Sequence, residues 1–273
     1  MFLIVLVIGY FLSLLIQPLI VGMITEAGLV KPNYKNQPIP LGLGLIFLFS
    51  TIVILGIGIP LGIFSSEEAL LTSFLIVTLG FLGLIDDLLG SRSASGFKGH
   101  FRKLLLERHL TTGALKALMG GLSALLVGFL IVAPEDWWLF LINGLLIALT
   151  ANAFNLLDLR PGRAIKFFLL CTIPFLFYFW EQERTILLAP LLGGVLAYFP
   201  LDLQAKGMMG DTGANLLGGF LGLLLAWTLS PFSKFFVLAL LFLFHFYTEK
   251  YSLTETINRV SWLKYLDELG RKG

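Results

Sequence analysis

Long apolar runs alternate with short polar links along most of this chain. A helix needs roughly 20 apolar residues to cross the hydrocarbon core of a bilayer. The pattern therefore predicts an all-α, polytopic integral membrane protein with about nine transmembrane helices. The predicted spans are 1–24, 41–64, 69–85, 114–132, 139–154, 164–180, 185–200, 213–229 and 235–247.

Composition agrees with this pattern. Of the 273 residues, 57% are hydrophobic and only 13% are charged, whereas about 25% of the residues in an ordinary soluble domain are charged. The mean hydropathy is +0.90. We expect a single transmembrane domain over 1–248, a short C-terminal tail over 249–273, and no nucleic-acid partner. Cys171 is the only cysteine, which excludes a disulfide framework and a cluster of thiolates around a metal.

Charge separates the polar links into two sets. Links after the first, third, fifth, seventh and ninth spans contain nearly all the Lys and Arg residues. The positive-inside rule places those links in the cytoplasm, so that the N-terminus lies outside and the C-terminus is cytoplasmic. The other links are mainly acidic, with Glu67, Glu68, Glu135, Asp136, Glu181 and Glu183.

Two adjacent carboxylates, Asp86 and Asp87, end the third apolar run. They resist burial unless water, a basic group or a metal relieves their charge. On a helix they point about 100° apart, so one could bind a metal while the other contacts a phosphate or hydroxyl of a substrate. The alternative is an ordinary solvated end of a span.

A second polar cluster, NAFNLLDLRPGRAIK (152–166), follows the fifth span. Asn155 and Asp158 are three residues apart and share a face if the helix continues that far. Arg160 and Arg163 suit a phosphate-bearing ligand, because the guanidinium fork matches phosphate oxygens. Anchoring of the span by positive charge explains the cations but not the two asparagines.

A third cluster, MMGDTGANLLGG, places Asp211 in a glycine-flanked turn directly before the eighth span. Asp211 could cap the helix. A helix N-terminus also binds phosphate, and Asp211 could hold the accompanying Mg²⁺. All three clusters fall on the predicted cytoplasmic face, where ionisable residues at span ends indicate a functional site.

Four segments, in this order, resemble the polyprenyl-phosphate N-acetylhexosamine-1-phosphate transferase superfamily. They are KPNYKNQPIPLGLG in the first cytoplasmic loop, GLIDDLLG after the third span, NAFNLLDLRPG after the fifth and MGDTGANLLGG before the eighth. The resemblance covers most of the chain. It implies that a polyprenyl phosphate in the bacterial cytoplasmic membrane attacks the β-phosphate of a UDP-linked amino sugar at the cytoplasmic face. UMP leaves, and the product serves cell-envelope synthesis.

The resemblance also implies roles for individual residues. Asp211 would hold Mg²⁺, Asp86 would deprotonate or orient the lipid phosphate, and Asp87 would support the metal or that base. Asn155 and Asp158 would position the nucleotide diphosphate, and Lys98, Arg102 and Lys103 would contact the lipid phosphate. Further positions expected to contact substrate are Asn152, Arg160, Arg163 and Lys35. A homodimer is left open.

Two departures from the family pattern leave alternatives open. Pro161 stands where the family usually carries a second aspartate, three residues after Asp158, and the histidine-rich last loop is absent. One alternative is therefore a catalytically altered homologue that acts as a ligand-binding or assembly partner in envelope synthesis. The other is a secondary transporter, although transporter sites lie near the midplane of the membrane, whereas these carboxylates lie at span ends.

Overall fold

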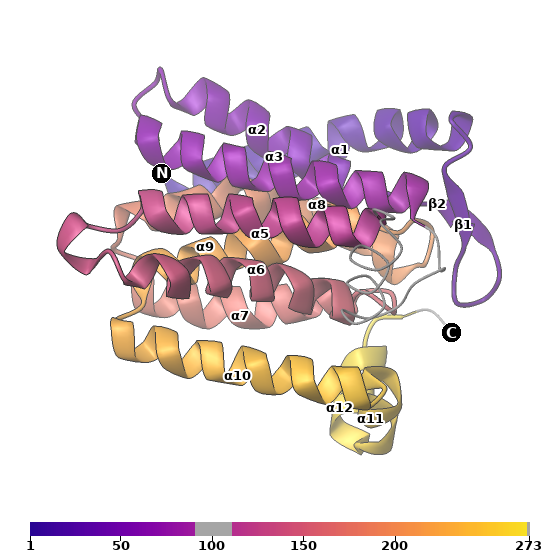
Figure 1. Ribbon diagram of the computed structural model, residues 1–273. Coiled ribbons are helices and arrows are strands. Elements are labelled where there is room, and N and C mark those ends of the chain that lie inside the picture. The colour runs from indigo at the N-terminus through magenta and orange to yellow at the C-terminus, as the bar shows by residue number, and fades with distance from the viewer. Residues whose placement is uncertain (91–110, 272–273) are drawn as a thin grey trace.

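The computed structural model describes residues 1–90 and 111–271. Within these residues, nine helices run side by side (Figure 1) and each falls on one predicted apolar segment. They are α1 (Phe2–Glu26), α2 (Leu45–Gly58), α3 (Ser66–Leu89), α5 (Thr112–Leu130), α6 (Leu139–Leu157), α7 (Arg163–Phe179), α8 (Leu188–Leu203), α9 (Gly210–Thr228) and α10 (Pro231–Lys250).

Six helical stretches in the described part of the chain are long and apolar enough to cross a membrane. The protein is thus an all-α membrane protein, whereas nine crossings and the sidedness of the termini stay predictions. The six stretches are Phe2–Glu26, Ser66–Leu89, Thr112–Leu130, Leu139–Leu157, Glu183–Leu203 and Pro231–Lys250. The fifth joins the short 3-10 helix η2 (Glu183–Leu187) to α8, and a second 3-10 helix, η1 (Pro134–Asp136), precedes α6.

A small hairpin, which the sequence pattern did not predict, occupies the polar link after α1. Its strands, β1 (Val30–Pro32) and β2 (Pro38–Pro40), pair antiparallel. The Asn33 side chain closes the turn by accepting hydrogen bonds from the main-chain N–H groups of Lys35 and Gln37. Asparagine favours this kind of local turn.

The helix in the predicted second span is shorter than expected, because neither 41–44 nor 59–64 is helical. Main-chain N–H groups of Leu43 and Gly44 donate to the carbonyls of Met208 and Met209, at 3.0 and 3.1 Å. The segment after β2 therefore lies against the turn before α9. This contact connects the hairpin to the end of the bundle where several polar clusters meet.

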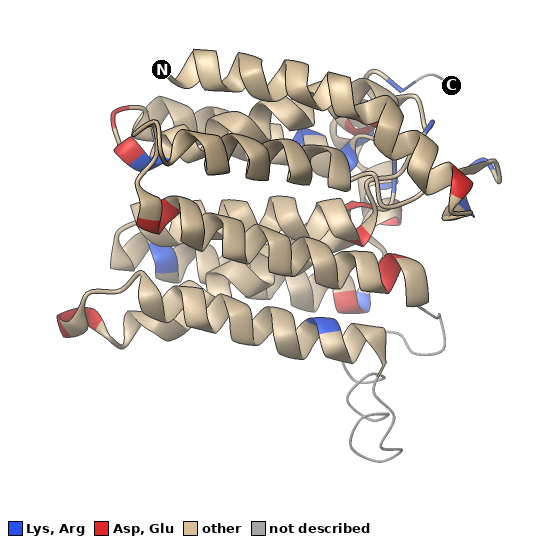
Figure 2. Ribbon diagram, turned by 90° about the horizontal axis from the view of Figure 1, so that it is seen from above, with Lys and Arg blue, Asp and Glu red and all other residues tan. Residues whose placement is uncertain are grey.

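Helix α9 lies inside the bundle. It is buried on nearly every side, as expected for a helix that is apolar all round, and it packs mainly against α3 and α6. By contrast, α10 exposes most of its large apolar side chains, and charged residues lie mainly at the two ends of the bundle (Figure 2). A membrane around the bundle would cover this apolar surface.

The C-terminal residues form two short helices, α11 (Leu253–Arg259) and α12 (Ser261–Glu268). They lie at the same end of the bundle as the hairpin, beside the end of α10 (Figure 1). Ile257 of α11 is buried. The expected boundary at 248/249 falls within α10, which continues to Lys250.

Candidate active site

Four helix ends meet at one point of the bundle. Asp86 comes from the last turn of α3, Asn155 from the last turn of α6, and Asp211 from the first turn of α9. Lys116 joins them from the second turn of α5. Polar clusters far apart in the sequence are thus brought together by the packing of α3, α5 and α6 around α9.

Lys116 is at the centre of this group. Its Nζ lies 2.9 Å from Asp86 Oδ2 and also donates a hydrogen bond to Asp211 Oδ2. Asn155 Nδ2 donates to the same oxygen of Asp211 at 3.0 Å. One cation therefore bridges two carboxylates, all with partial access to solvent.

Sequence reasoning missed Lys116, because LTTGALKALMG reads as the capped start of a helix. Thr111 is indeed the N-cap of α5 and accepts a hydrogen bond from the main-chain N–H of Ala114. The available signal was a single cation one turn inside an apolar span, which requires a partner of opposite charge.

Asp87 points away from Lys116 and caps the N-terminus of α9 from a different helix. Its two carboxylate oxygens accept hydrogen bonds from Asp211 N (3.0 Å), Thr212 N (3.0 Å) and Thr212 Oγ1 (2.7 Å). A carboxylate at a helix N-terminus pairs with exposed N–H groups and with the positive end of the helix dipole. The structure thus gives Asp87 a supporting contact to α9, and its expected metal contact stays a prediction.

Two glycines allow α3 and α9 to approach this closely. A Cβ on Gly83 would lie 2.3 Å from the carbonyl oxygen of Asp211, and a Cβ on Gly210 would lie 2.4 Å from Asp87 Oδ2. Gly210 also has φ +69°, a conformation that other residues rarely adopt. Both positions therefore need glycine to keep Asp87 against the first turn of α9.

The hairpin braces the same region. Lys31 Nζ donates to the main-chain carbonyl of Asp87 at 2.9 Å. At the hairpin turn, the Tyr34 ring lies 5.3 Å from the guanidinium of Arg160 and 5.6 Å from Nζ of Lys35. Lys35 and Arg160, two expected substrate contacts, therefore both lie next to the Tyr34 ring.

Asp158 ends α6 as its C-cap. It keeps part of its surface exposed, yet burial raises its pKa well above the usual value, and the negative charges of Asp202, Asp211 and Asp87 raise this pKa further. The neighbouring acidic groups therefore oppose ionisation of Asp158, and a cation bound nearby would favour its ionised form. Asn152 lies on α6 one turn before Asn155 and is half-buried.

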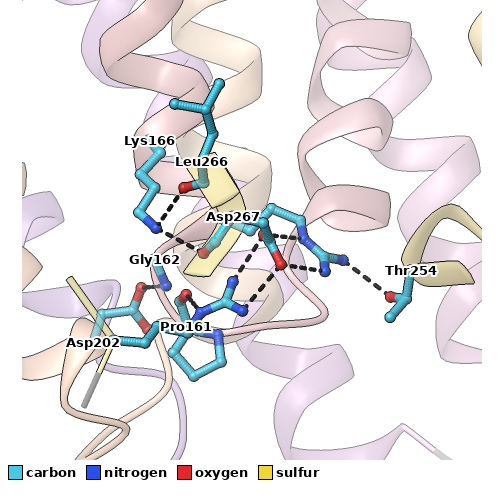
Figure 3. Close-up of polar contacts among 9 residues, drawn as sticks. Pro161, Gly162, Lys166, Asp202, Thr254, Leu266 and Asp267 are labelled. Carbon is cyan, nitrogen blue, oxygen red and sulfur yellow. Dashed lines mark hydrogen bonds and ion pairs between the residues drawn. The ribbon is translucent and has the colours of Figure 1, made fainter. Parts of the chain in front are cut away.

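Arg163 is engaged elsewhere. It is buried, and its guanidinium binds Asp267 through Nε (2.7 Å) and Nη2 (3.0 Å) and Thr254 through Nη1 (3.0 Å). Lys166 Nζ donates to the main-chain carbonyls of Leu266 and Asp267 (Figure 3). These cations thus hold the C-terminal segment. Lys98, Arg102 and Lys103 lie outside the described residues.

The residues around Lys116 fit a magnesium site that is completed by a ligand. Within the described residues no group of three His, Cys, Asp or Glu side chains could hold a metal. Mg²⁺, however, is commonly bound by one or two carboxylates together with substrate phosphates. Asp86 and Asp211 supply two carboxylates, and Asn155 Oδ1 is buried without a hydrogen-bond partner. This donor set is entirely oxygen, as Mg²⁺ prefers.

Comparison with known proteins covers the region that forms this site. A model of the family described as "Glycosyl transferase family 4" matches residues 69–229, from the first turn of α3 to the end of α9. The chain is also similar to enzymes named phospho-N-acetylmuramoyl-pentapeptide-transferase from several bacteria. That of Thermotoga neapolitana is 29% identical over 241 residues, covering 82% of this chain and 74% of the relative.

Two further relatives have similar coverage. The enzyme of Clostridium kluyveri is 27% identical over 240 residues, which cover 79% of this chain and 72% of that enzyme. The enzyme of Chlamydia trachomatis serovar L2 is 24% identical over 246 residues, again covering 79% and 72%.

Proposed function

Since the chain belongs to glycosyl transferase family 4, we propose that it transfers a sugar-1-phosphate from a UDP-N-acetylhexosamine to a polyprenyl phosphate in the membrane. An oxygen of the polyprenyl phosphate forms a bond to the β-phosphorus, the bond from that phosphorus to the bridging oxygen breaks, and UMP leaves. The observation that carries the proposal is the bridge from Lys116 to both Asp86 and Asp211. The reaction brings phosphate groups of like charge together, and phosphoryl transfer depends on positioning and charge neutralisation.

Lys116 and Asp86 have complementary parts in this proposal. Lys116 neutralises charge on the phosphate that is transferred, because its Nζ lies at the meeting point of the four helices. Asp86 lies next to it and accepts the proton of, or orients, the polyprenyl phosphate. Nζ of Lys116 and Oδ2 of Asp86 form an ion pair at 2.9 Å.

Asp211 is proposed as the principal Mg²⁺ ligand, Asp86 would supply a second carboxylate, and Asp87 fixes Asp211 through its main-chain N–H. Bound Mg²⁺ would supply further neutralisation of the diphosphate charge. Asn155 holds Asp211 Oδ2 in place through Nδ2. Asn155 Oδ1, which is buried without a hydrogen-bond partner, would offer a further oxygen ligand.

The nucleotide part of the substrate is proposed to bind between the C-terminal end of α6 and the turn of the hairpin. Asn152, Asn155 and Asp158 would contact the nucleotide diphosphate, and Arg160 and Lys35 would approach its phosphates from the Tyr34 ring. Lys98, Arg102 and Lys103 are proposed for the lipid phosphate. The site would face the cytoplasm from a bacterial cytoplasmic membrane, in agreement with the basic links at this end.

A second candidate function is a homologue that binds the nucleotide sugar without turnover. Pro161 in place of a carboxylate, together with the engagement of Arg163 by Asp267, favours it. Both observations concern the segment that joins α6 to the start of α7. Neither changes the contacts of Lys116 with Asp86 and Asp211. The two candidates therefore predict the same binding but different turnover.

A transfer assay in nanodiscs separates them. The purified protein is given undecaprenyl phosphate, Mg²⁺ and a panel of UDP-amino sugars, and release of UMP is measured. We expect UMP with one or more sugars, and none from Asp86→Asn or Asp211→Asn. Glu255→Gln, an exposed acid on α11, serves as the control that retains activity. A rise in Tm with nucleotide sugar but no UMP would instead support the binding homologue.

A further inference from the structure

Helix α12 has three distinct faces. Leu263 and Asp267 are its least exposed residues and lie on one side, because residues four apart share a face. Trp262, Tyr265 and Leu266 form a second, apolar face, with exposed fractions of 64%, 66% and 48%. The third face, with Lys264 and Glu268, is polar and exposed.

Polar contacts fix the orientation of α12 on the bundle. Asp267 is held by two hydrogen bonds from Arg163 of α7 and by two from Arg271, at 2.7 to 3.0 Å. Arg271 Nε also donates to the carbonyl of Pro161 at 2.7 Å. These contacts of Asp267 with Arg163 and Arg271, drawn in Figure 3, therefore keep the Asp267 side of α12 towards the loop after α6. The apolar face must point outward.

Exposed apolar side chains also lie at the end of α10. Phe246 and Tyr247, in the last turn of α10, and Tyr251, directly after it, are exposed by 68%, 40% and 50%. Tyr247 also hydrogen-bonds Thr256 of α11 at 2.7 Å, which holds α11 and α12 beside the end of α10. If α10, a candidate membrane span that ends at Glu249 and Lys250, crosses the membrane, α12 lies at the level where hydrocarbon meets headgroups.

We propose that α12 docks on the membrane, with Trp262, Tyr265, Leu266 and the adjoining Leu269 in the boundary between headgroups and acyl chains. Amphipathic helices with aromatic residues on the apolar face lie in this boundary, and Trp and Tyr prefer it because they combine a large ring with a polar group. The charged face of Lys264 and Glu268 stays in water.

The same helix then links the lipid surface to the candidate active site. Through Asp267, α12 holds Arg163 and Arg271, and Arg271 holds Pro161, three residues after Asp158. The loop from Asp158 to Arg163 is therefore braced against a helix that rests on the membrane. This inference needs only that α10 spans the membrane and does not depend on the proposed reaction.

Spin labelling of the full chain in bilayer nanodiscs of phosphatidylethanolamine and phosphatidylglycerol tests the proposal. Single labels are placed through Trp262→Cys and Tyr265→Cys, in a Cys171→Ala background that removes the only native cysteine. Lys264→Cys, on the polar face of the same helix, is the matched control. Collision rates of each label with lipid-soluble oxygen and with a water-soluble nickel chelate are compared.

We expect the oxygen-to-nickel ratio to be several-fold higher at the Trp262 and Tyr265 positions than at the Lys264 position. Equal ratios at all three positions would overturn the proposal, because the apolar face would then lie in water. Labels at Trp262 and Tyr265 that meet neither reagent and broaden one another's spectra between copies would also overturn it, in favour of an interface with a second copy of the chain. Because the labelled positions are exposed, the replacements leave the packing of the bundle intact.

Discussion

Thr212 Oγ1 donates a 2.7 Å hydrogen bond to Asp87 Oδ2, which joins the start of α9 to the end of α3. With the two main-chain bonds beside it, this contact sets where Asp211 stands relative to Asp86. The two neighbouring aspartates therefore differ in kind. Asp86 pairs with the cation Lys116, whereas Asp87 joins the end of α3 to the start of α9.

Asp87→Asn should lower stability more than Asp86→Asn does. An amide at position 87 would turn one N–H₂ group towards N–H donors, leaving a buried donor unpaired at a cost of about 1–3 kcal/mol. Asp86→Asn instead removes one of two carboxylates that share Lys116. Thermal unfolding in detergent should therefore give a lower Tm for Asp87→Asn and a Tm near wild type for Asp86→Asn. Equal Tm values would contradict the capping role of Asp87.

Gly83→Ala should separate α3 from α9. The added Cβ would lie 2.3 Å from a main-chain oxygen of Asp211, and main chain cannot move aside as a flexible side chain can. We expect a lower Tm and loss of transfer activity together. Gly121→Ala in α5 is the matched control, since a Cβ there meets nothing within 4 Å and alanine favours helix. If both variants behaved alike, the close approach at Gly83 would not matter.

Lys116→Met should reduce transfer on the order of 100-fold, the size of effect seen when one charge-stabilising group is removed from an active site. It should also change the response to Mg²⁺. Asp86 and Asp211 would face each other without a cation, so added Mg²⁺ should raise the Tm of this variant more than that of wild type. Lys264→Met, at an exposed lysine, should alter neither property. A Tm response in Lys116→Met no larger than in wild type would argue against a cation site between the two carboxylates.

The contact between Asp267 and Arg163 should depend on pH only in strong acid. Burial opposes ionisation of Asp267, but hydrogen bonds from Arg163 and Arg271 outweigh it and lower the pKa to about 2. An aspartate in an unfolded chain has a pKa of about 3.9. Because the folded value is the lower one, the contact stabilises the protein above about pH 4 and its contribution is lost as the pH falls through about 2.

The measurement is the Tm difference between wild type and Asp267→Asn as a function of pH. It should be constant from neutral pH down to about pH 4, and it should shrink between about pH 4 and 2. Glu255→Gln, at an exposed i,i+4 pair, is the matched control. A difference that already disappeared near pH 6 would contradict the assignment of the effect to Asp267.

The sequence predicted the helices well because hydrophobic runs report directly on burial in lipid or protein. Each of the nine apolar segments contains one helix among the described residues, and Asp86 and Asp87 point in different directions, as a spacing of 100° requires. The second span was predicted too long at both ends. Leu43 and Gly44 pair with the main chain before α9, and α2 ends at Gly58.

The contacts that define the site could not be predicted in the same way. Lys116 pairs with residues 30 and 95 positions away, and periodicity within one helix does not tell which helix ends meet. Arg163 fits a phosphate ligand by residue type, yet its partner is Asp267, 104 positions along the chain. Residue chemistry indicated that these groups needed partners, and only the packing identified them.

Transfer of a β-phosphate label tests the central claim most directly. UDP-N-acetylglucosamine and related UDP-amino sugars carrying ³²P at the β-phosphate are incubated with the protein, undecaprenyl phosphate and Mg²⁺. We predict that the label moves to the lipid with release of unlabelled UMP in equal amount, and that Asp211→Asn transfers none. Label that stays on the nucleotide with every sugar, or transfer that is unchanged in Asp211→Asn, would contradict the account.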